Sequence, residues 1–331
     1  MFVVDSPFVA IICCVITMLG WGSWANTQKL AGRERWPFPL YYWDYGFGVL
    51  LFSLLFLAAP GSFGTAGEGG LTNLSHAAAG PIGAALLSGL EFNVSNLLLV
   101  AAIDAAGMSV AFPVGVGLAL VIGTVKSYLS APKGNPAFLF GGVALVVLAM
   151  ILSALAHARL PRQTGGKAAR GLIFAVVAGC LMGVFYPQLM TAISPGFRSG
   201  SIQAGMLTPY TALLFFALGV AGSNFAVNTI FVKLNGLRLS EYTAGSARLH
   251  SLGILGGLIW MLALSLNVLA SGVAGPAVSY ALGQGATLVA AIWGVFVWKE
   301  FCAAGDSTRT LLALMFASYA AGLILIGWAS L

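Results

Sequence analysis

The stretch Ser88-Gly89-Leu90-Glu91-Phe92-Asn93-Val94-Ser95-Asn96 places a carboxylate, two carboxamides and hydroxyl groups inside an apolar run that extends from Pro81 to Ile103. This run is long enough to cross a bilayer, because a spanning helix needs about 20 apolar residues. Glu91 would then lie near the midplane, where an ionisable side chain is costly and is usually kept for a function. The stretch therefore predicts a membrane helix that carries part of a functional site.

The whole chain has the composition of a membrane protein. Of its 331 residues, 59% are hydrophobic and 7% are charged, whereas soluble domains carry about 25% charged residues. We predict an all-α integral membrane protein with ten transmembrane helices and short connections. The expected helices cover residues 7–28, 39–59, 81–103, 108–130, 136–158, 170–191, 206–230, 248–268, 274–298 and 309–330.

The basic residues gather on one side of this helix arrangement. The odd-numbered connections hold twelve of the 15 lysines and arginines, and the opposite side holds only Lys126, Lys133 and Arg198. Cytoplasmic loops carry the excess of basic residues in membrane proteins. We therefore expect the odd-numbered loops to be cytoplasmic and both termini to face outward, in a plasma membrane or a bacterial inner membrane.

A weak internal repeat divides the chain into two halves. A shift of 161 residues places Gly22 on Gly183, and a shift of 168 places residues 112–117 on residues 280–285. We expect five-helix repeats at 1–158 and 170–331, joined by a basic cytoplasmic linker at 159–169. Because five is odd, the two repeats would be inverted relative to each other, as in many transporters that alternate access to a site near the midplane.

The polar residues of the third predicted helix lie on two faces. At about 100° per residue, Asn93 and Asn96 share a stripe with Gly89, whereas Glu91 and Ser95 lie on the opposite side. We expect Glu91 to bind and release a proton during transport, and Asn93 and Asn96 to face the substrate. The alternative for Glu91 is a permanently protonated or amide-paired structural residue.

Two further helices combine aromatic and carboxamide side chains on one face. In the first, Trp21, Trp24 and Gln28 are three to four residues apart, and in the ninth Tyr280 and Gln284 have the same spacing. Such faces suit a flat polar molecule that stacks on the rings and forms hydrogen bonds at its edge. The alternatives are an interfacial aromatic belt for the tryptophans and polar helix–helix contacts in the ninth helix.

Other polar positions are weaker candidates. Tyr186-Pro187-Gln188 is expected to break the sixth helix and to place Tyr186 and Gln188 in the cavity. Asn224 in the seventh helix and Trp260 in the eighth could line it too, or could pack in the core. For Asp44 we expect a salt bridge near Arg33 and Arg35 or a helix cap, and for His250 an interfacial position.

The sequence holds no recognisable enzyme or cofactor motif. It lacks a glycine-rich phosphate loop with a lysine, a His/Cys/carboxylate cluster at metal spacing and a GxSxG elbow. The four cysteines show neither metal nor disulfide spacing, and no basic stretch with interleaved aromatics points to nucleic acid. We therefore predict no cofactor, no metal and no enzymatic activity.

Three segments resemble a known family. They are Gly22-Ser23-Trp24 with Tyr42-Trp43-Asp44-Tyr45, Val121-Ile122-Gly123-Thr124 with Tyr128, and Ser279-Tyr280-Ala281 with Trp293-Gly294-Val295, Trp298-Lys299-Glu300 and Ser307-Thr308-Arg309-Thr310. Together with ten helices in two inverted halves, they resemble the drug/metabolite transporter superfamily, and within it the plant ureide permeases and the related glucose/ribose/rhamnose-type sugar transporters. The resemblance implies proton-coupled uptake of a small polar metabolite, either a ureide or nucleobase or a monosaccharide.

The sequence-based hypothesis is thus a secondary active transporter for a small neutral polar solute, with a proton as the second partner. Two alternatives remain open. One is efflux of drug-like or amphipathic compounds, and the other is a passive facilitator or channel.

Overall fold

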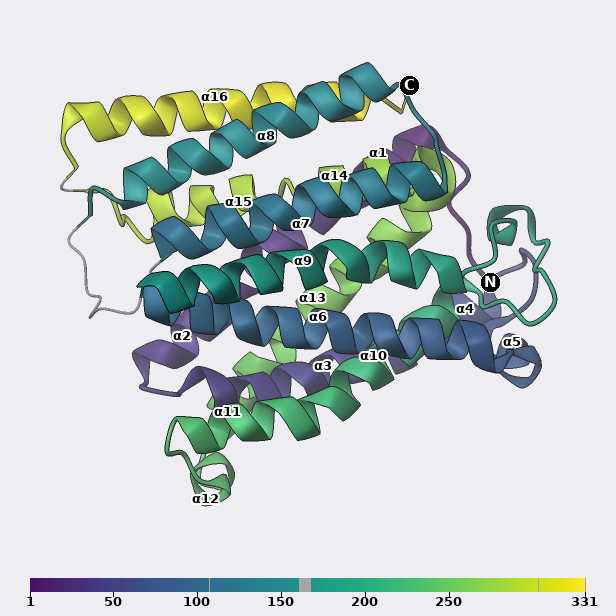
Figure 1. Cartoon of the computed structure of the whole chain (residues 1–331). Coiled ribbons are helices and arrows are strands. Elements are labelled where there is room, and N and C mark those ends of the chain that lie inside the picture. Colours follow the sequence, from purple (N-terminus) through teal and green to yellow (C-terminus); the bar gives the residue numbers. More distant parts are fainter. Residues whose placement is uncertain (107, 161–167, 303, 331) are drawn as a thin grey trace.

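The computed structural model describes residues 1–106, 108–160, 168–302 and 304–330, and in these ranges the chain is a bundle of long helices (Figure 1). Ten helical stretches are long and apolar enough to cross a membrane, which confirms the predicted all-α membrane fold. In chain order these ten spans are Pro7–Arg33, Phe38–Phe63, Ala79–Ile103, Pro113–Ser130, Pro136–His157, Ala169–Ala192, Pro209–Leu234, Ala247–Ala274, Pro276–Val297 and Asp306–Trp328.

Most spans coincide with a single helix, and four are interrupted or extended by a short turn. The single helices are α6 (Ala79–Ala106), α7 (Met108–Ser130), α8 (Pro136–His157), α9 (Ala168–Ala192), α13 (Ala247–Ala274) and α16 (Asp306–Trp328). The composite spans are α1 (Pro7–Ser23) with α2 (Ala25–Arg33), α3 (Phe38–Ala58) with α4 (Pro60–Phe63), α10 (Pro209–Ser223) with the π-helical turn η2 (Asn224–Asn228) and α11 (Thr229–Leu234), and α14 (Pro276–Gly283) with α15 (Ala286–Ile292) and the π-helical turn η3 (Trp293–Val297).

The two ends of the bundle differ in their loops. One end, here called the basic end, carries α2, α11 and α12 (Leu239–Thr243) and the start of α16 (Figure 1). The opposite end, here called the terminal end, carries both chain termini, α4, α5 (Gly70–His76) and the short helix η1 (Phe197–Ser199) (Figure 1). Residues 161–167 of the expected linker 159–169 lie outside the described residues.

The neighbours of the spans follow a reciprocal pattern. The first span packs against the eighth and the ninth, and the sixth span packs against the third and the fourth. The second span packs against the eighth, and the seventh against the third. If each span is exchanged for the one five places away in the chain, each of these contacts maps onto another one.

The expected break at Pro187 is wrong, because α9 runs through this position from Ala168 to Ala192. A proline removes one backbone donor and crowds the preceding turn, but packing against neighbouring helices allows membrane helices to continue through it. α9 has such support, since it packs along both α6 and α7. Interruptions lie instead in other spans, among them Trp24 between α1 and α2 and Gln284–Gly285 between α14 and α15.

Candidate functional site

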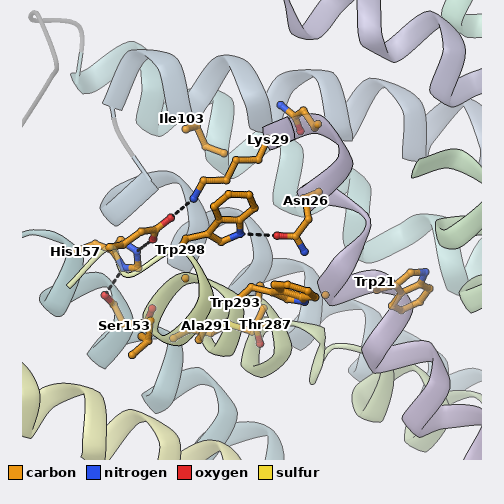
Figure 2. A pocket seen from close by; sticks show the side chains of 18 of the residues that line it. Trp21, Asn26, Lys29, Ile103, Ser153, His157, Thr287, Ala291, Trp293 and Trp298 are labelled. Carbon is orange, nitrogen blue, oxygen red and sulfur yellow. Dashed lines mark hydrogen bonds and ion pairs between the residues drawn. The ribbon is translucent and has the colours of Figure 1, made fainter. Parts of the chain in front are cut away.

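A cavity of about 690 Å³ enters the bundle from the basic end. Its mouth is formed by Lys29 and Arg33 of α2, by His157 at the end of α8, and by Trp298 and Glu300, which follow η3 (Figure 2). The wall deeper inside comes from the junction of α1 and α2, from α6 and from the ninth span. Trp21, Trp24, Gln28 and Asn96 of the sequence-based candidates line this cavity.

A second compartment of about 130 Å³ lies further inside and shares Trp21, Trp24, Asn96 and Thr287 with the first. It reaches the middle of the bundle, where Trp260 occupies the centre of α13. We call this second space the inner compartment. Its other residues include Phe92, Phe185, Met182 and Gln284.

The inner compartment has aromatic walls with polar groups between them. The ring of Trp260 stacks on that of Phe92 with centroids 4.1 Å apart, and on that of Trp21 at 5.9 Å. The carboxamides of Asn96 and Gln284 and the Thr287 hydroxyl supply hydrogen-bonding groups. None of the described residues that line this compartment is charged.

The position of Asn96 is fixed from behind. Its Nδ2 donates to Tyr42 Oη at 3.0 Å, and the Tyr42 ring stacks on Tyr45, whose own ring packs against Trp24 at 5.0 Å. Because all of these groups are buried or half-buried, the wall is held by tightly packed neighbours.

Tyr186 and Tyr280 lie outside the cavity, one turn beyond Met182 and Gln284 toward the terminal end. Their rings pack at 4.9 Å. Tyr186 Oη bonds Ser279 Oγ at 3.1 Å, and Tyr280 Oη donates to the carbonyls of Ala119 and Met182, each at 3.2 Å. Both side chains are fully buried. These two sequence candidates therefore lie between the inner compartment and the terminal end.

Glu91 also lies outside both compartments. It is three residues after Ser88 and four before Ser95, and both of these hydroxyls donate to carbonyls of α9, at 2.7 and 2.8 Å. Residues at this spacing share a helix face, so Glu91 lies on the side of α6 that contacts α9. Its Oε2 atom is buried without a hydrogen-bond partner.

Three other candidates also lie away from the cavity. Asn93 is fully buried, and neither of its polar side-chain atoms has a partner. Asn224 donates from Nδ2 to the carbonyl of Tyr42 at 2.9 Å and so ties η2 to α3. Gln188 is half-buried on α9, beyond the compartment residue Phe185.

The structure brings further residues to the cavity that sequence reasoning did not place there. Trp293 Nε1 donates to Ser23 Oγ at 2.9 Å. Trp298 Nε1 donates to Asn26 Oδ1 at 2.6 Å (Figure 2). These bonds join the π-helical turn η3 to the α1–α2 junction. π-helical turns are frequent at functional sites, but no local sequence pattern predicts the turn η3. Phe92 was hidden for another reason, because it lies between Glu91 and Asn93 and reads as ordinary core.

The mouth of the cavity is held by an ionic cluster. Lys29 Nζ forms an ion pair with Glu300 Oε1, and His157 Nε2 lies 3.8 Å from Glu300 Oε2. The Trp298 ring lies beneath both Lys29 Nζ, 4.4 Å from its centroid, and the Arg33 guanidinium, at 4.6 Å. Hydrogen bonding by His157 and by the Lys29 ammonium, together with the charge of Lys29, lowers the pKa of Glu300 from its ordinary value of 4.5 to about 2.

This lowered pKa predicts a pH-dependent contribution to stability. A depressed carboxyl pKa stabilises the folded state above the unfolded pKa, and the contribution is lost as pH falls from about 4.5 towards 2. We expect Glu300→Gln to lower the melting temperature by a few degrees at pH 7, since a partly exposed ion pair contributes about 0.5–1 kcal/mol. The difference should shrink as pH falls below about 4.5 and vanish near pH 2.

Thermal melts of the purified proteins between pH 7 and 3 measure this difference. Glu34→Gln is the control, because Glu34 pairs with Arg248 in a more exposed position at the same end. A wild-type advantage over Glu300→Gln that is as large at pH 3 as at pH 7 would contradict the assignment.

Comparison with known proteins adds a likeness over nearly the whole chain. No family model matches it. It is similar to Ureide permease 1 of Arabidopsis thaliana, with 23% identity over 95% of each chain, and to Ureide permease 4, with 22% identity over 98% of each. Ureide permease 2 is 28% identical over 47% of this chain and 40% of its own. A solved crystal structure shares the fold, with a TM-score of 0.60, 16% identity and 96% coverage of both chains.

Proposed function

We propose that the protein is a membrane transporter that binds a small, neutral, polar metabolite of the ureide class in the inner compartment. The observation that carries this proposal is the composition of that compartment. Aromatic faces enclose it, the carboxamides of Asn96 and Gln284 and the hydroxyl of Thr287 reach it, and none of the described lining residues is charged. A charged ligand would find no counter-ion there, and burying an unpaired charge is costly.

The chemistry of a ureide matches these groups. Urea units and cyclic amides carry N–H donors and carbonyl acceptors around a flat core. A carboxamide side chain offers both a donor and an acceptor, so Asn96 and Gln284 can pair with both kinds of group. The rings of Trp260, Trp21 and Phe92 present flat apolar surfaces on which such a core can stack.

The similarity to ureide permeases supports this ligand class. The size of the inner compartment argues against the alternative of drug-like compounds. About 130 Å³ is well below the roughly 300–1,000 Å³ of pockets that hold drug-sized ligands. A one-ring metabolite fits such a space, whereas most of a drug-sized molecule would remain in the larger compartment.

Alternating access fits the closure of the cavity. The cavity is reached from the basic end, and Tyr186 and Tyr280 lie between it and the terminal end. By the positive-inside rule the basic end is cytoplasmic, so we assign the described conformation as inward-facing. The reciprocal neighbours of the spans support two inverted five-helix repeats, which would rock about the inner compartment to open the terminal end.

We further propose that transport is coupled to a proton bound by Glu91. Protonation would remove a charge from the α6–α9 contact, and it would shift the two conformations only as far as it stabilises them differently. Because Glu91 lies outside both compartments, proton and substrate would occupy separate sites.

Ligand binding tests the substrate proposal. Ligands that bind the folded state raise its melting temperature by mass action, so thermal-shift screening against ureides, nucleobases and monosaccharides should give stabilisation by a ureide. Gln284→Met removes one carboxamide at nearly constant size and should weaken that ligand about tenfold, which corresponds to about 1.4 kcal/mol for one or two hydrogen bonds.

Gln188→Met is the matched control, since Gln188 lies outside the cavity, and its affinity should equal that of the wild type. Stabilisation by monosaccharides or drug-like compounds and by no ureide would refute the proposed ligand class. Equal weakening in both variants would refute the proposed site.

Transport in proteoliposomes tests the proton coupling. Glu91→Gln mimics the protonated carboxyl, so it should retain counterflow exchange of the ligand but lose accumulation driven by a pH gradient. Unchanged pH-driven accumulation in this variant would eliminate Glu91 as the coupling group. If wild-type uptake never exceeds the equilibrium ratio under a pH gradient, the protein is a passive facilitator instead.

A further inference from the structure

Asp44 is a buried carboxylate on α3 that the proposed transport mechanism does not use. Only 2% of the residue is exposed. Its two carboxylate oxygens lie 3.0 and 2.9 Å from Nδ1 of His250 on α13, and Tyr242 Oη of α12 donates to Oδ1 at 2.7 Å. The expected partners Arg33 and Arg35 are absent from the ion pairs of Asp44 in the described structure. Three separate elements therefore meet at one carboxylate.

The short contacts with Nδ1 mean that a proton lies between the imidazole and the carboxylate. With neutral His250 and ionised Asp44, the cluster has a net charge of −1. One further proton gives either an imidazolium–carboxylate pair or a carboxylic acid beside a neutral imidazole, and both have a net charge of zero. Because a net charge is poorly tolerated in an apolar interior, the gain or loss of this proton changes how firmly the three elements hold together.

The proton has a route to the aqueous side at the basic end. The side chain of His250 is 25% exposed, whereas that of Asp44 is 3% exposed. Nε2 of His250 faces Gly245 in the turn between α12 and α13. The ring edges of Trp36 and Tyr242 flank the imidazole, with centroids at 5.6 and 4.8 Å. His250 can therefore exchange protons with water while Asp44 remains enclosed.

Few other charged groups act on this pair. On α3 itself Tyr41 lies close enough to Asp44 to interact with its charge, and the Tyr41 hydroxyl bonds Thr27 Oγ1 at 2.7 Å. Beside it on α13, Arg248 pairs with Glu34 at 3.2 Å. On α12, Glu241 accepts from the backbone N–H of Arg238. η2 of the seventh span presents neutral asparagines to α3.

The same two turns of α3 hold the wall of the cavity. Tyr41 bonds Thr27, which precedes the cavity residue Gln28. Tyr42 accepts the hydrogen bond of Asn96, and Tyr45 packs on Trp24. α3 and α13 are in direct contact here, since a methyl group added at Gly253 would lie 2.3 Å from Asp44 Cβ. A shift of α3 against α13 at Asp44 would therefore move Asn96 and Trp24.

We propose that Asp44 and His250 form a proton-binding site, separate from Glu91, whose occupancy is linked to ligand binding in the inner compartment. The linkage rests on the proposed function, whereas the proton site does not. Linkage is reciprocal, so the ligand affinity must depend on pH through this pair. For one linked proton, the dissociation constant changes by up to tenfold per pH unit.

The linkage is tested with the ureide that stabilises the wild type, by measuring its dissociation constant from pH 5 to 9. His250→Gln and Asp44→Asn should reduce the slope of log Kd against pH by at least half. His76→Gln is the matched control, because His76 forms a similar pair with Glu68, at 2.7 Å, on the exposed terminal end. A slope in His250→Gln equal to that of the wild type would overturn the linkage.

The proton site itself is tested without any ligand. Melting temperatures from pH 5 to 9 should show a transition in the wild type and in His76→Gln that His250→Gln lacks, and a transition retained in His250→Gln would overturn the site. Tyr242→Phe is the variant to use for the carboxylate side of the pair if Asp44→Asn fails to fold. It removes a hydrogen bond that favours the ionised carboxylate, so the transition should move to higher pH, and an unmoved transition would count against the site. If no ureide binds the wild type, the proposed function fails while this assay still decides the proton site.

Discussion

The backbone of a membrane-spanning segment has no water to bond with, so irregular backbone is tolerated only where it is buried in protein or lines a water-filled space. In this bundle the interruptions of the first and ninth spans both border one cavity, as that constraint requires. Trp24, Gln284 and the turn η3 (Trp293–Val297) all border the same cavity. Hydrogen bonds from Trp293 and Trp298 to Ser23 and Asn26 join the two interrupted spans. The irregular backbone of the first and ninth spans therefore borders the cavity.

The polar side chains of the spans divide into two groups by the same constraint. Some tie helices together, as Ser88 and Ser95 bind α9 and Asn224 binds α3. Others, such as Asn96 and Gln284, line the cavity. Both groups look alike in a sequence, because each appears as a polar residue inside an apolar run. Only the packing of the helices shows which partner is near.

This division explains how much could be predicted from the sequence. Hydrophobic length alone gave the ten spans, and helical spacing brought Trp21, Trp24 and Gln28 to one wall. In the ninth helix, Gln284 lines the inner compartment, whereas Tyr280, one turn away on the same face, lies beyond it. A periodic face is as long as its helix, whereas the cavity occupies only part of that length.

Local sequence patterns could not predict contacts between residues that are far apart in the chain. Asp44 and His250 are separated by 206 residues, and the arginines near Asp44 in the sequence suggested a different partner. The predicted helix break at Pro187 was wrong for a related reason. A proline weakens its own helix locally, and the packing of α6 and α7 along α9 is a property of the folded bundle.

The proposed transport function requires that a ligand enter the cavity from the basic end. Ala291 lines the larger compartment, and Ala291→Cys can be studied after replacement of the exposed Cys180 and Cys302. The decisive measurement is the rate at which a membrane-impermeant maleimide, supplied at the basic end, labels this cysteine. The reference is a protein with Ala291 intact in which Cys302 is the exposed cysteine that remains. A saturating ureide should slow the labelling of position 291 severalfold and leave that of Cys302 unchanged. An equal rate with and without ligand, or labelling only from the terminal end, would contradict an inward-facing substrate cavity.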